Sequence, residues 1–295
     1  MQLLQLIYFQ KVAQLQHMTH AAEDLHVAQP ALSKTINNLE SELGVKLFDR
    51  RGKYIELNSY GEAFLKSVNI ILDTLNESVK TIQDMKGEVT GTVKLVVLSA
   101  SKMLPGLLAS FRKKYPQVQF RLLQHSSVSS YKADYDFCIY STVPQENTPN
   151  SVLLMTEQIF LAVPKGHPFA SRTNISLSEA SEEQFVSLKP GSNLRNITDF
   201  YCSAAGFIPK VIFESDDPAM VRGLIYAGLG VAFIPEISWG GSTSPYMTMI
   251  KIIEPDCRRN LELSWSPDHY LSKCALLFRD FAIDFFAKCG PVSDE

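Results

Sequence analysis

Short polar side chains between residues 29 and 38 have the chemistry needed to read the edges of DNA bases. Their hydroxyls and amides can both donate and accept hydrogen bonds, as base edges in the major groove require. Residues 49 to 53 follow as a basic run that suits contact with a phosphate backbone. The side chains expected to contact DNA are Thr19, Gln29, Pro30, Ala31, Ser33, Lys34, Thr35, Asn38, Arg50, Arg51 and Lys53.

Two short helices joined by a tight turn are needed to position these side chains. Thr19 is a suitable N-cap for the first helix, and residues 26 to 28 form the turn. Pro30 suits the start of the second helix, because its missing N–H would have no partner there, and Gly44 is a typical stop. A small hairpin with its tip at residues 49 to 53 follows. The buried stripe of the second helix is expected to contain Leu32, Ile36, Leu39 and Leu43.

The residues of this region resemble, in order and spacing, those of the LysR-type transcriptional regulators. The match runs from residue 9 to residue 61 without a gap. The resemblance implies a winged helix-turn-helix DNA-binding domain over residues 1–58. It also implies double-stranded operator or promoter DNA and RNA polymerase as partners. The matching residues are Phe9, Val12, Ala13, Thr19, Ala21, Ala22, Leu25, Gln29, Pro30, Ala31, Leu32, Ser33, Ile36, Leu39, Glu40, Leu43, Gly44, Leu47, Phe48, Arg50, Leu57 and Gly61.

Three positions depart from the family pattern. Ala28 stands where Ser is common, so a hydroxyl that could cap the second helix is absent. Asn58 stands where Thr is usual. Lys34 stands where Arg is common, which favours contact with a phosphate or a single acceptor over paired recognition of a guanine. These departures keep the fold and leave the operator sequence open.

The charge balance favours a dimer. The whole chain has a formal net charge of −3 at pH 7, and basic and acidic side chains are equal in number over residues 1–58. A neutral module that contacts few phosphates binds DNA weakly on its own, whereas a dimer doubles those contacts.

A long amphipathic helix over residues 59–87 can supply the dimer contact. Ser59 and Glu62 have the spacing of a capping box. Apolar residues then recur in steps of four and three, as in the seam of a coiled coil, with Ser78 as a weak position. The resemblance implies a linker helix that pairs two subunits, and a homo-tetramer. The alternative is that the seam packs against the chain's own domain. The residues expected to dimerise are Phe64, Val68, Ile71, Leu75, Ile82 and Met85.

Strand-like and helical runs alternate from Thr92 onward, which predicts an α/β fold. The expected fold is therefore α/β overall, with an N-terminal winged helix-turn-helix, a long linker helix and a C-terminal effector domain. By resemblance, that domain has two lobes, like a periplasmic binding protein. We expect residues 88–163 and 265–292 in the first lobe and residues 164–264 in the second, with crossings near Pro164 and Ser264.

Ligands of such folds bind between the lobes, beyond the carboxyl ends of strands and at the N-termini of helices. Hydroxyls and backbone N–H groups without a converging pair of carboxylates suit a small anion. We therefore hypothesise an anionic small-molecule effector, with a simple helix cap as the alternative role of each serine. The residues that the rule selects are Ser99, Ala100, Ser101, Tyr140, Ser141, Pro190, Gly191, Ser192, Asn193, Asp216, Gly230 and Val231.

Two further segments carry expectations. Residues 124–136 are short and rich in serine where the family usually has a full helix, so that helix is expected to be reduced or lost. His167 lies in a run that is common in the family, and we expect it to be structural.

Composition indicates an ordinary globular protein, with 45% hydrophobic and 20% charged residues. No apolar run approaches the roughly 20 residues of a membrane helix. The N-terminal residues lack the basic region and cleavage site of a signal peptide, so we expect a cytoplasmic protein. The five cysteines include no close pair and no histidine companion, so they are expected to be structural, and neither a metal nor a cofactor is expected.

No phosphate-binding loop and no nucleophile elbow is found in the sequence, so we do not expect an enzyme. The alternative function is a two-lobed solute-binding or enzymatic protein with an accessory helical domain. That alternative leaves residues 19 to 51 unexplained.

Overall fold

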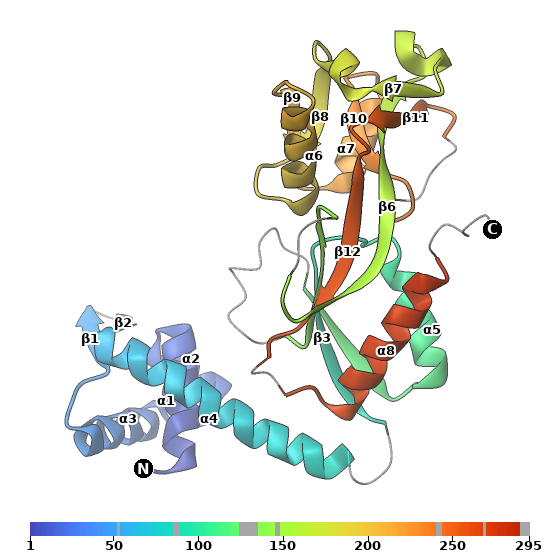
Figure 1. Ribbon diagram of the computed structural model, residues 1–295. Coiled ribbons are helices and arrows are strands. Elements are labelled where there is room, and N and C mark those ends of the chain that lie inside the picture. Colours follow the sequence, from blue (N-terminus) through green and yellow to red (C-terminus); the bar gives the residue numbers. More distant parts are fainter. Residues whose placement is uncertain are drawn as a thin grey trace. The chain divides into compact units, whose positions relative to one another are not determined.

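The chain divides into two compact units, residues 1–86 and 87–295. The computed structural model (Figure 1) describes residues 1–51, 54–84, 89–123, 135–144, 148–239, 244–267 and 270–289. The boundary between the units falls where we expected the linker helix to end. Each unit is described by itself.

The N-terminal unit is a winged helix-turn-helix domain followed by a long helix. Its core contains Phe9, Val12, Leu32, Leu39 and Val68, which are all fully buried. The wing strands pair antiparallel from Phe48 opposite Leu57 to Arg51 opposite Tyr54. The elements are α1 (Leu3–Leu15), α2 (Met18–Asp24), α3 (Gln29–Leu43), β1 (Phe48–Arg51), β2 (Tyr54–Leu57) and α4 (Ser59–Asp84).

Helix α3 begins and ends as predicted. Pro30 lies in its first turn, and Gly44 ends it with a φ of 72°. The prediction that Leu43 is buried was wrong, because this side chain is 36% exposed. Glu40 is buried in the last turns instead, where its carboxylate accepts the Leu47 N–H at 2.9 Å and pairs with Lys46 at 2.7 Å.

The caps of two helices differ from the prediction. His17, not Thr19, precedes α2, and its Nδ1 accepts the N–H of His20 at 3.3 Å. Thr19 lies inside the helix. Asn58, not Ser59, caps α4, since its Oδ1 accepts the N–H of Gly61 at 3.0 Å. Helix α2 begins two residues earlier than predicted and α4 one residue earlier. In each case the side chain just before the first turn is the one that can reach the free N–H groups.

The first lobe of the C-terminal unit is built on a mixed sheet, in which three parallel strands are followed by two antiparallel ones. Strands β4, β3 and β5 are parallel neighbours, and β12 then pairs antiparallel with β5 and with β6. Helices α5 and α8 lie side by side against this lobe (Figure 1). The elements are β3 (Gly91–Val97), α5 (Leu104–Lys114), β4 (Val118–Leu123), β5 (Phe137–Thr142), β6 (Ser151–Pro164), β12 (Arg258–Ser264) and α8 (Lys273–Ala287).

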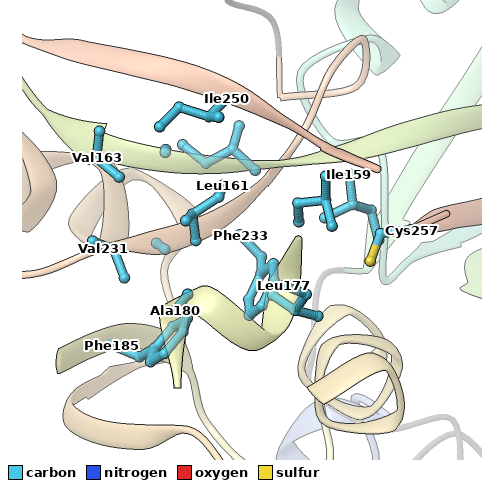
Figure 2. Close-up of a cluster of buried hydrophobic side chains, with 14 of the residues drawn as sticks. Ile159, Leu161, Val163, Leu177, Ala180, Phe185, Val231, Phe233, Ile250 and Cys257 are labelled. Atoms are coloured by element: carbon cyan, nitrogen blue, oxygen red, sulfur yellow. The ribbon is translucent and has the colours of Figure 1, made fainter. Parts of the chain in front are cut away.

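The second lobe surrounds the far half of β6. Its core packs Ile159, Leu161, Val231 and Phe233 against Phe185 (Figure 2), and the last two rings stack at 5.4 Å. The elements are η2 (Pro168–Ser171), β7 (Asn174–Ser176), η3 (Leu177–Ala180), β8 (Gln184–Leu188), α6 (Asn193–Ala204), β9 (Lys210–Ser215), α7 (Pro218–Tyr226), β10 (Ala232–Pro235) and β11 (Met247–Glu254).

The lobes meet at other residues than the expected boundaries at 163/164 and 264/265. Strand β6 is continuous over 14 residues, and its pairing changes from β12 to β10 between Gln158 and Ile159. The return crossing lies between Cys257, which belongs to the second core, and Leu261, which belongs to the first. The boundary was misplaced because β6 is one long strand shared by two sheets. Its apolar pattern continues through the point where it leaves one core and enters the other.

The two segments noted in the sequence have different outcomes. Residues 124–134 lie outside the described residues, so the expectation of a reduced helix there stays a prediction. His167 is structural, because its Nδ1 accepts the N–H of Phe169 and its Nε2 lies 3.2 Å from the Glu183 carboxylate. None of the described helices is both long and apolar enough to cross a membrane.

The buried thiols should be chemically inert in the folded protein. Burial raises the pKa values of Cys138, Cys202 and Cys257 to about 12, so roughly one in ten thousand is a thiolate at pH 8. We expect iodoacetamide at pH 8 to leave these three unmodified, as read by peptide mass spectrometry, and to alkylate all of them in urea. The partly exposed Cys289 is the internal reference. Rapid modification of the three in the folded chain would contradict their structural role.

Candidate functional site

The outer face of α3 exposes most of the side chains predicted to contact DNA. Gln29, Pro30, Ala31, Lys34 and Asn38 are all exposed. The residue before the helix, Ala28, provides no side-chain cap, as its departure from the family pattern predicted. The face therefore offers amide and amine groups that no described bond engages within the helix.

Two of the residues on α3 that are predicted to contact DNA are only partly exposed. The Thr35 hydroxyl donates to the Ala31 carbonyl at 2.9 Å, so only its lone pairs face outward. Ser33 is half-buried and lines a small cavity of about 290 Å³ together with Asn37 of α3 and Phe48 of the wing. Ser33 thus lies where the helix meets the wing.

The basic wing is described only in its backbone. Arg50 and Arg51 belong to β1, and the pairing of Arg51 with Tyr54 leaves two residues at the tip. The side chains of both arginines, and all of Lys53, lie outside the described residues. Their contacts with DNA stay predictions. The predicted small hairpin is confirmed by the strand register, but Asp49, Arg50 and Arg51 belong to strand β1 and not to the tip, where they were predicted.

The predicted seam of α4 divides into two parts. Phe64 packs against the N-terminal core and Val68 is 0% exposed within it, so both are removed from the predicted dimer face. The reason is that α1 packs along this part of α4, where Gln10 donates to Asn69 at 2.8 Å. Beyond Val68, the large apolar residues described as exposed on α4 are Ile70, Ile71, Leu75 and Val79. The side chain of Ile82 and all of Met85 lie outside the described residues.

The C-terminal unit holds two cavities lined by predicted effector residues. The first, of about 460 Å³, is lined by Ser101, Ser192, Asn193 and Asp216. Lys189 and Asp217, which the sequence analysis did not select, line it as well. The second, of about 330 Å³, is lined by Tyr140, Ser141 and Asn193, with Thr142, Asn196 and Phe200 among the others.

The first cavity contradicts one premise of the anion hypothesis. Asp216 and Asp217 come together in its wall, so a pair of carboxylates does converge there. Both have partners, since Asp217 caps α7 through the Ala219 N–H at 2.8 Å and Asp216 lies 3.5 Å from the Lys189 Nζ. Adjacent residues after a strand could have been recognised, because both follow β9 directly.

Six predicted residues lie outside both cavities, and four of them belong to the second lobe. Pro190 and Gly191 are exposed in the loop before α6. Gly230 and Val231 were wrongly assigned, because they line a separate hollow of about 590 Å³. Their role is packing. A Cβ on Gly230 would lie 2.6 Å from the Gln184 carbonyl oxygen, and Val231 exchanges backbone hydrogen bonds with β8.

The remaining predicted residues lie behind the second cavity. Ser99 and Ala100 are buried, and the Ser99 hydroxyl is 3.0 Å from that of Ser141. Ala100 has a φ of 60°, which a non-glycine residue adopts rarely.

Glu262 is a buried carboxylate that the sequence analysis missed. Hydroxyls of Tyr140, Thr142 and Ser151 donate to it at 3.1, 2.6 and 2.6 Å. Burial raises the pKa of Tyr140, so its hydroxyl stays protonated and donates. The phenol is therefore turned toward the sheet.

A buried ion pair was missed as well. Arg259 of β12 and Glu157 of β6 are joined at 2.9 Å, and the guanidinium is 1% exposed. Burial lowers the pKa of Arg259, and the Glu157 carboxylate opposes that shift. Glu157 inside the largely apolar strand β6 was the available signal, whereas β12 contains several other polar residues. Among the described residues, no group of side chains could hold a metal ion.

Two family models match the chain. The model described as "Bacterial regulatory helix-turn-helix protein, lysR family" covers residues 3–62. The model described as "LysR substrate binding domain" covers residues 86–287. The chain therefore belongs to the LysR family of transcriptional regulators, which are DNA-binding proteins with an effector-binding domain and not enzymes.

Two relatives from Bacillus subtilis (strain 168) are similar in sequence along nearly the whole chain. The uncharacterised regulator YybE is 36% identical over 96% of this chain and 99% of its own length. The transcriptional dual regulator GltC is 35% identical over 98% of both. This settles the choice between a regulator and the solute-binding or enzymatic alternative.

Solved structures share the fold. A full-length variant of OxyR from Pseudomonas aeruginosa has a TM-score of 0.73 at 22% identity, covering 98% of this chain and 95% of its own. Full-length CbnR in complex with its target DNA has a TM-score of 0.67 at 21% identity, covering 98% and 100%. The effector-binding domain of QuiR in complex with shikimate has a TM-score of 0.58 at 23% identity, covering 68% and 98%.

Proposed function

We propose that the protein binds its operator as a homodimer through α3 and the wing, and that a small anionic effector in the inter-lobe cavities modulates this binding. The exposed polar face of α3, with Gln29, Lys34 and Asn38 beside a hairpin, is the observation that carries the proposal. A helix with such a face fits the major groove, while a basic hairpin contacts phosphates.

Lys34 is the exposed cation of this face, so its replacement tests DNA recognition. We expect Lys34→Ala to weaken binding to an operator selected from random DNA by about 1–3 kcal/mol if the amine donates to a base. If it neutralises a phosphate, the slope of log affinity against log salt should fall by about one. Gel shifts over a range of salt measure both quantities.

Lys210→Ala, at an exposed position on β9, is the matched control and should change neither quantity. Ser33→Ala reports on the side chain between helix and wing. If Lys34→Ala and Ser33→Ala both leave affinity and salt slope at the wild-type values, α3 is not the reading helix.

A dimer contact is supported by the exposed apolar part of α4. Ile71 and Leu75 are each 43% exposed and lie four residues apart, so they share one helix face. Such a face loses solvent when it pairs with a second copy. The N-terminal domain also has few cationic side chains to hold DNA, so two copies gain more than one.

Ile71→Glu combined with Leu75→Glu should therefore separate the subunits. We expect light scattering to give the monomer mass, and operator affinity to fall on the order of 100-fold. Lys66→Glu places the same charge at an exposed position on another face of α4 and should leave the mass unchanged. A dimer that survives the double substitution would move the interface elsewhere.

An anionic effector group is supported by donors in the first cavity. Ser192 precedes α6 without capping it, because its hydroxyl donates to the Lys189 carbonyl at 2.9 Å. The first N–H groups of this 12-residue helix thus remain for a ligand. The Lys189 amine lies only loosely against Asp216, so an anion can compete for it.

Calorimetry on the full chain with carboxylic acids, their amides and diamines tests this charge preference. We expect acids to bind, and Lys189→Met to weaken them by about 1 kcal/mol, since a hydrogen bond to a charged group is lost. Lys210→Met is the control outside the cavity. Binding of diamines alone would reject the anionic effector and point to Asp216 and Asp217.

Three expectations follow from the family alone and stay proposals. These are assembly into a homo-tetramer, contact with RNA polymerase, and a cytoplasmic location, where the chromosome of a bacterium lies.

A further inference from the structure

Three segments of the C-terminal unit, which we call crossings, extend from one hydrophobic core to the other; two pass across, and the third reaches the first core and returns to the second. In β6, Met155 belongs to the first core and Ile159 to the second. In the approach to β12, Cys257 belongs to the second core and Leu261 to the first. After β10, Ile237 packs on the first core and Trp239 lies in the second.

A buried polar side chain lies at the middle of each crossing. These are Glu157, Arg259 and Ser238, and all three are at most 2% exposed. They bond to one another. The Arg259 guanidinium donates to Glu157 at 2.9 Å and to the Ser238 hydroxyl at 2.7 Å, and that hydroxyl donates to Glu157 at 2.5 Å.

The carboxylate also holds the backbone of the third crossing. The second oxygen of Glu157 accepts the N–H groups of Ile237 and Ser238 at 2.9 and 2.8 Å. Every crossing segment is thereby fixed at one point. A buried ion pair contributes little net stability compared with apolar side chains, but its hydrogen bonds have fixed directions.

The same guanidinium reaches the wall of the second cavity. Arg259 donates to the Ser141 hydroxyl at 3.3 Å, and Ser141 lines that cavity. A ligand that takes a hydrogen bond from Ser141 therefore acts on the point where the crossings are joined.

We propose that Glu157, Arg259 and Ser238 form the pivot on which the two lobes turn, with Ser141 connecting this pivot to the effector cavity. The proposal rests on the proposed function, in which an effector in the inter-lobe cavities modulates DNA binding, and it adds that this modulation proceeds through the orientation of the lobes. The three are positioning residues. They hold the crossings at one point, so that a change at the cavity rotates one lobe relative to the other without sliding the strands.

The distance between the lobes tests the pivot directly. Spin labels on Ser171→Cys of the second lobe and Asp284→Cys of α8, in a full-length Cys289→Ser chain, can be measured by double electron–electron resonance. Labelled chains are diluted with unlabelled protein so that only distances within one chain contribute. Glu157→Leu combined with Arg259→Met keeps the volume apolar and removes the directed bonds. We expect the distance distribution to widen at least twofold.

Two further variants make the result decisive. Ser238→Ala frees the third crossing and leaves the ion pair, so we expect a smaller widening; it decides the matter if the double variant does not fold. Thr156→Val removes the neighbouring bond between the same strands, from Thr156 to Asn260 at 2.8 Å, and should leave the width unchanged.

A lowered thermal midpoint with the wild-type distance width would show a purely structural role and overturn the proposal. Widening by Thr156→Val equal to that of the pivot variants would overturn it too. Neither DNA nor an effector is present in the measurement, so failure of the proposed function in the binding experiments is seen separately.

Discussion

The effector-binding unit depends on one continuous strand that belongs to two sheets. Strand β6 pairs with β12 in the first lobe and with β10 and β11 in the second. Because β6 pairs with neighbouring strands from Ser151 to Pro164, with one register shift opposite Leu261 and Glu262, the strand resists breaking between the lobes, and any relative motion must bend or twist it. The buried pair of Glu157 and Arg259 lies next to the point where the pairing of β6 changes. The directed bonds of this pair therefore lie where β6 would bend.

In the N-terminal unit, helix α4 contributes both to the core of the DNA-binding domain and to an exposed apolar face. The first turns of α4 bury Val68 and pack Phe64 in the DNA-binding domain, and later turns expose Ile71 and Leu75. A regular heptad spacing cannot distinguish these uses, since both need apolar residues at the same intervals. The burial that fixes α4 to its own domain also gives the exposed turns a rigid base, so a partner helix there would set the spacing of two α3 helices.

Features fixed by neighbouring residues, such as helix ends, were predictable from the sequence. Contacts between residues that are distant in the sequence were not. Pro30 and Gly44 bound α3 because their backbone restrictions act within a turn. The rule for the carboxyl ends of strands selected Ser101, Ser192 and Asn193, which line the first cavity, and their contact with an effector stays a prediction. It failed at Gly230, where close packing against Gln184 rather than a ligand needs the missing Cβ. The pairing of Glu157 with Arg259 spans 102 positions, and only the register of β6 and β12 brings them together.

The charges around the two cavities constrain where an anion can bind. In the first cavity an anionic group must draw Lys189 away from Asp216 and lie near Asp217. In the second, the described lining carries hydroxyls and amides but no ionised side chain. Behind that lining, Glu262 accepts a hydrogen bond from the Tyr140 hydroxyl, while Arg259 donates one to the Ser141 hydroxyl. A hydroxyl that accepts a bond from a cation becomes a better donor, so Ser141 favours an acceptor in the cavity. An effector that spans both cavities, with its acceptor at Ser141 and its anionic end at α6, satisfies both sets of neighbours.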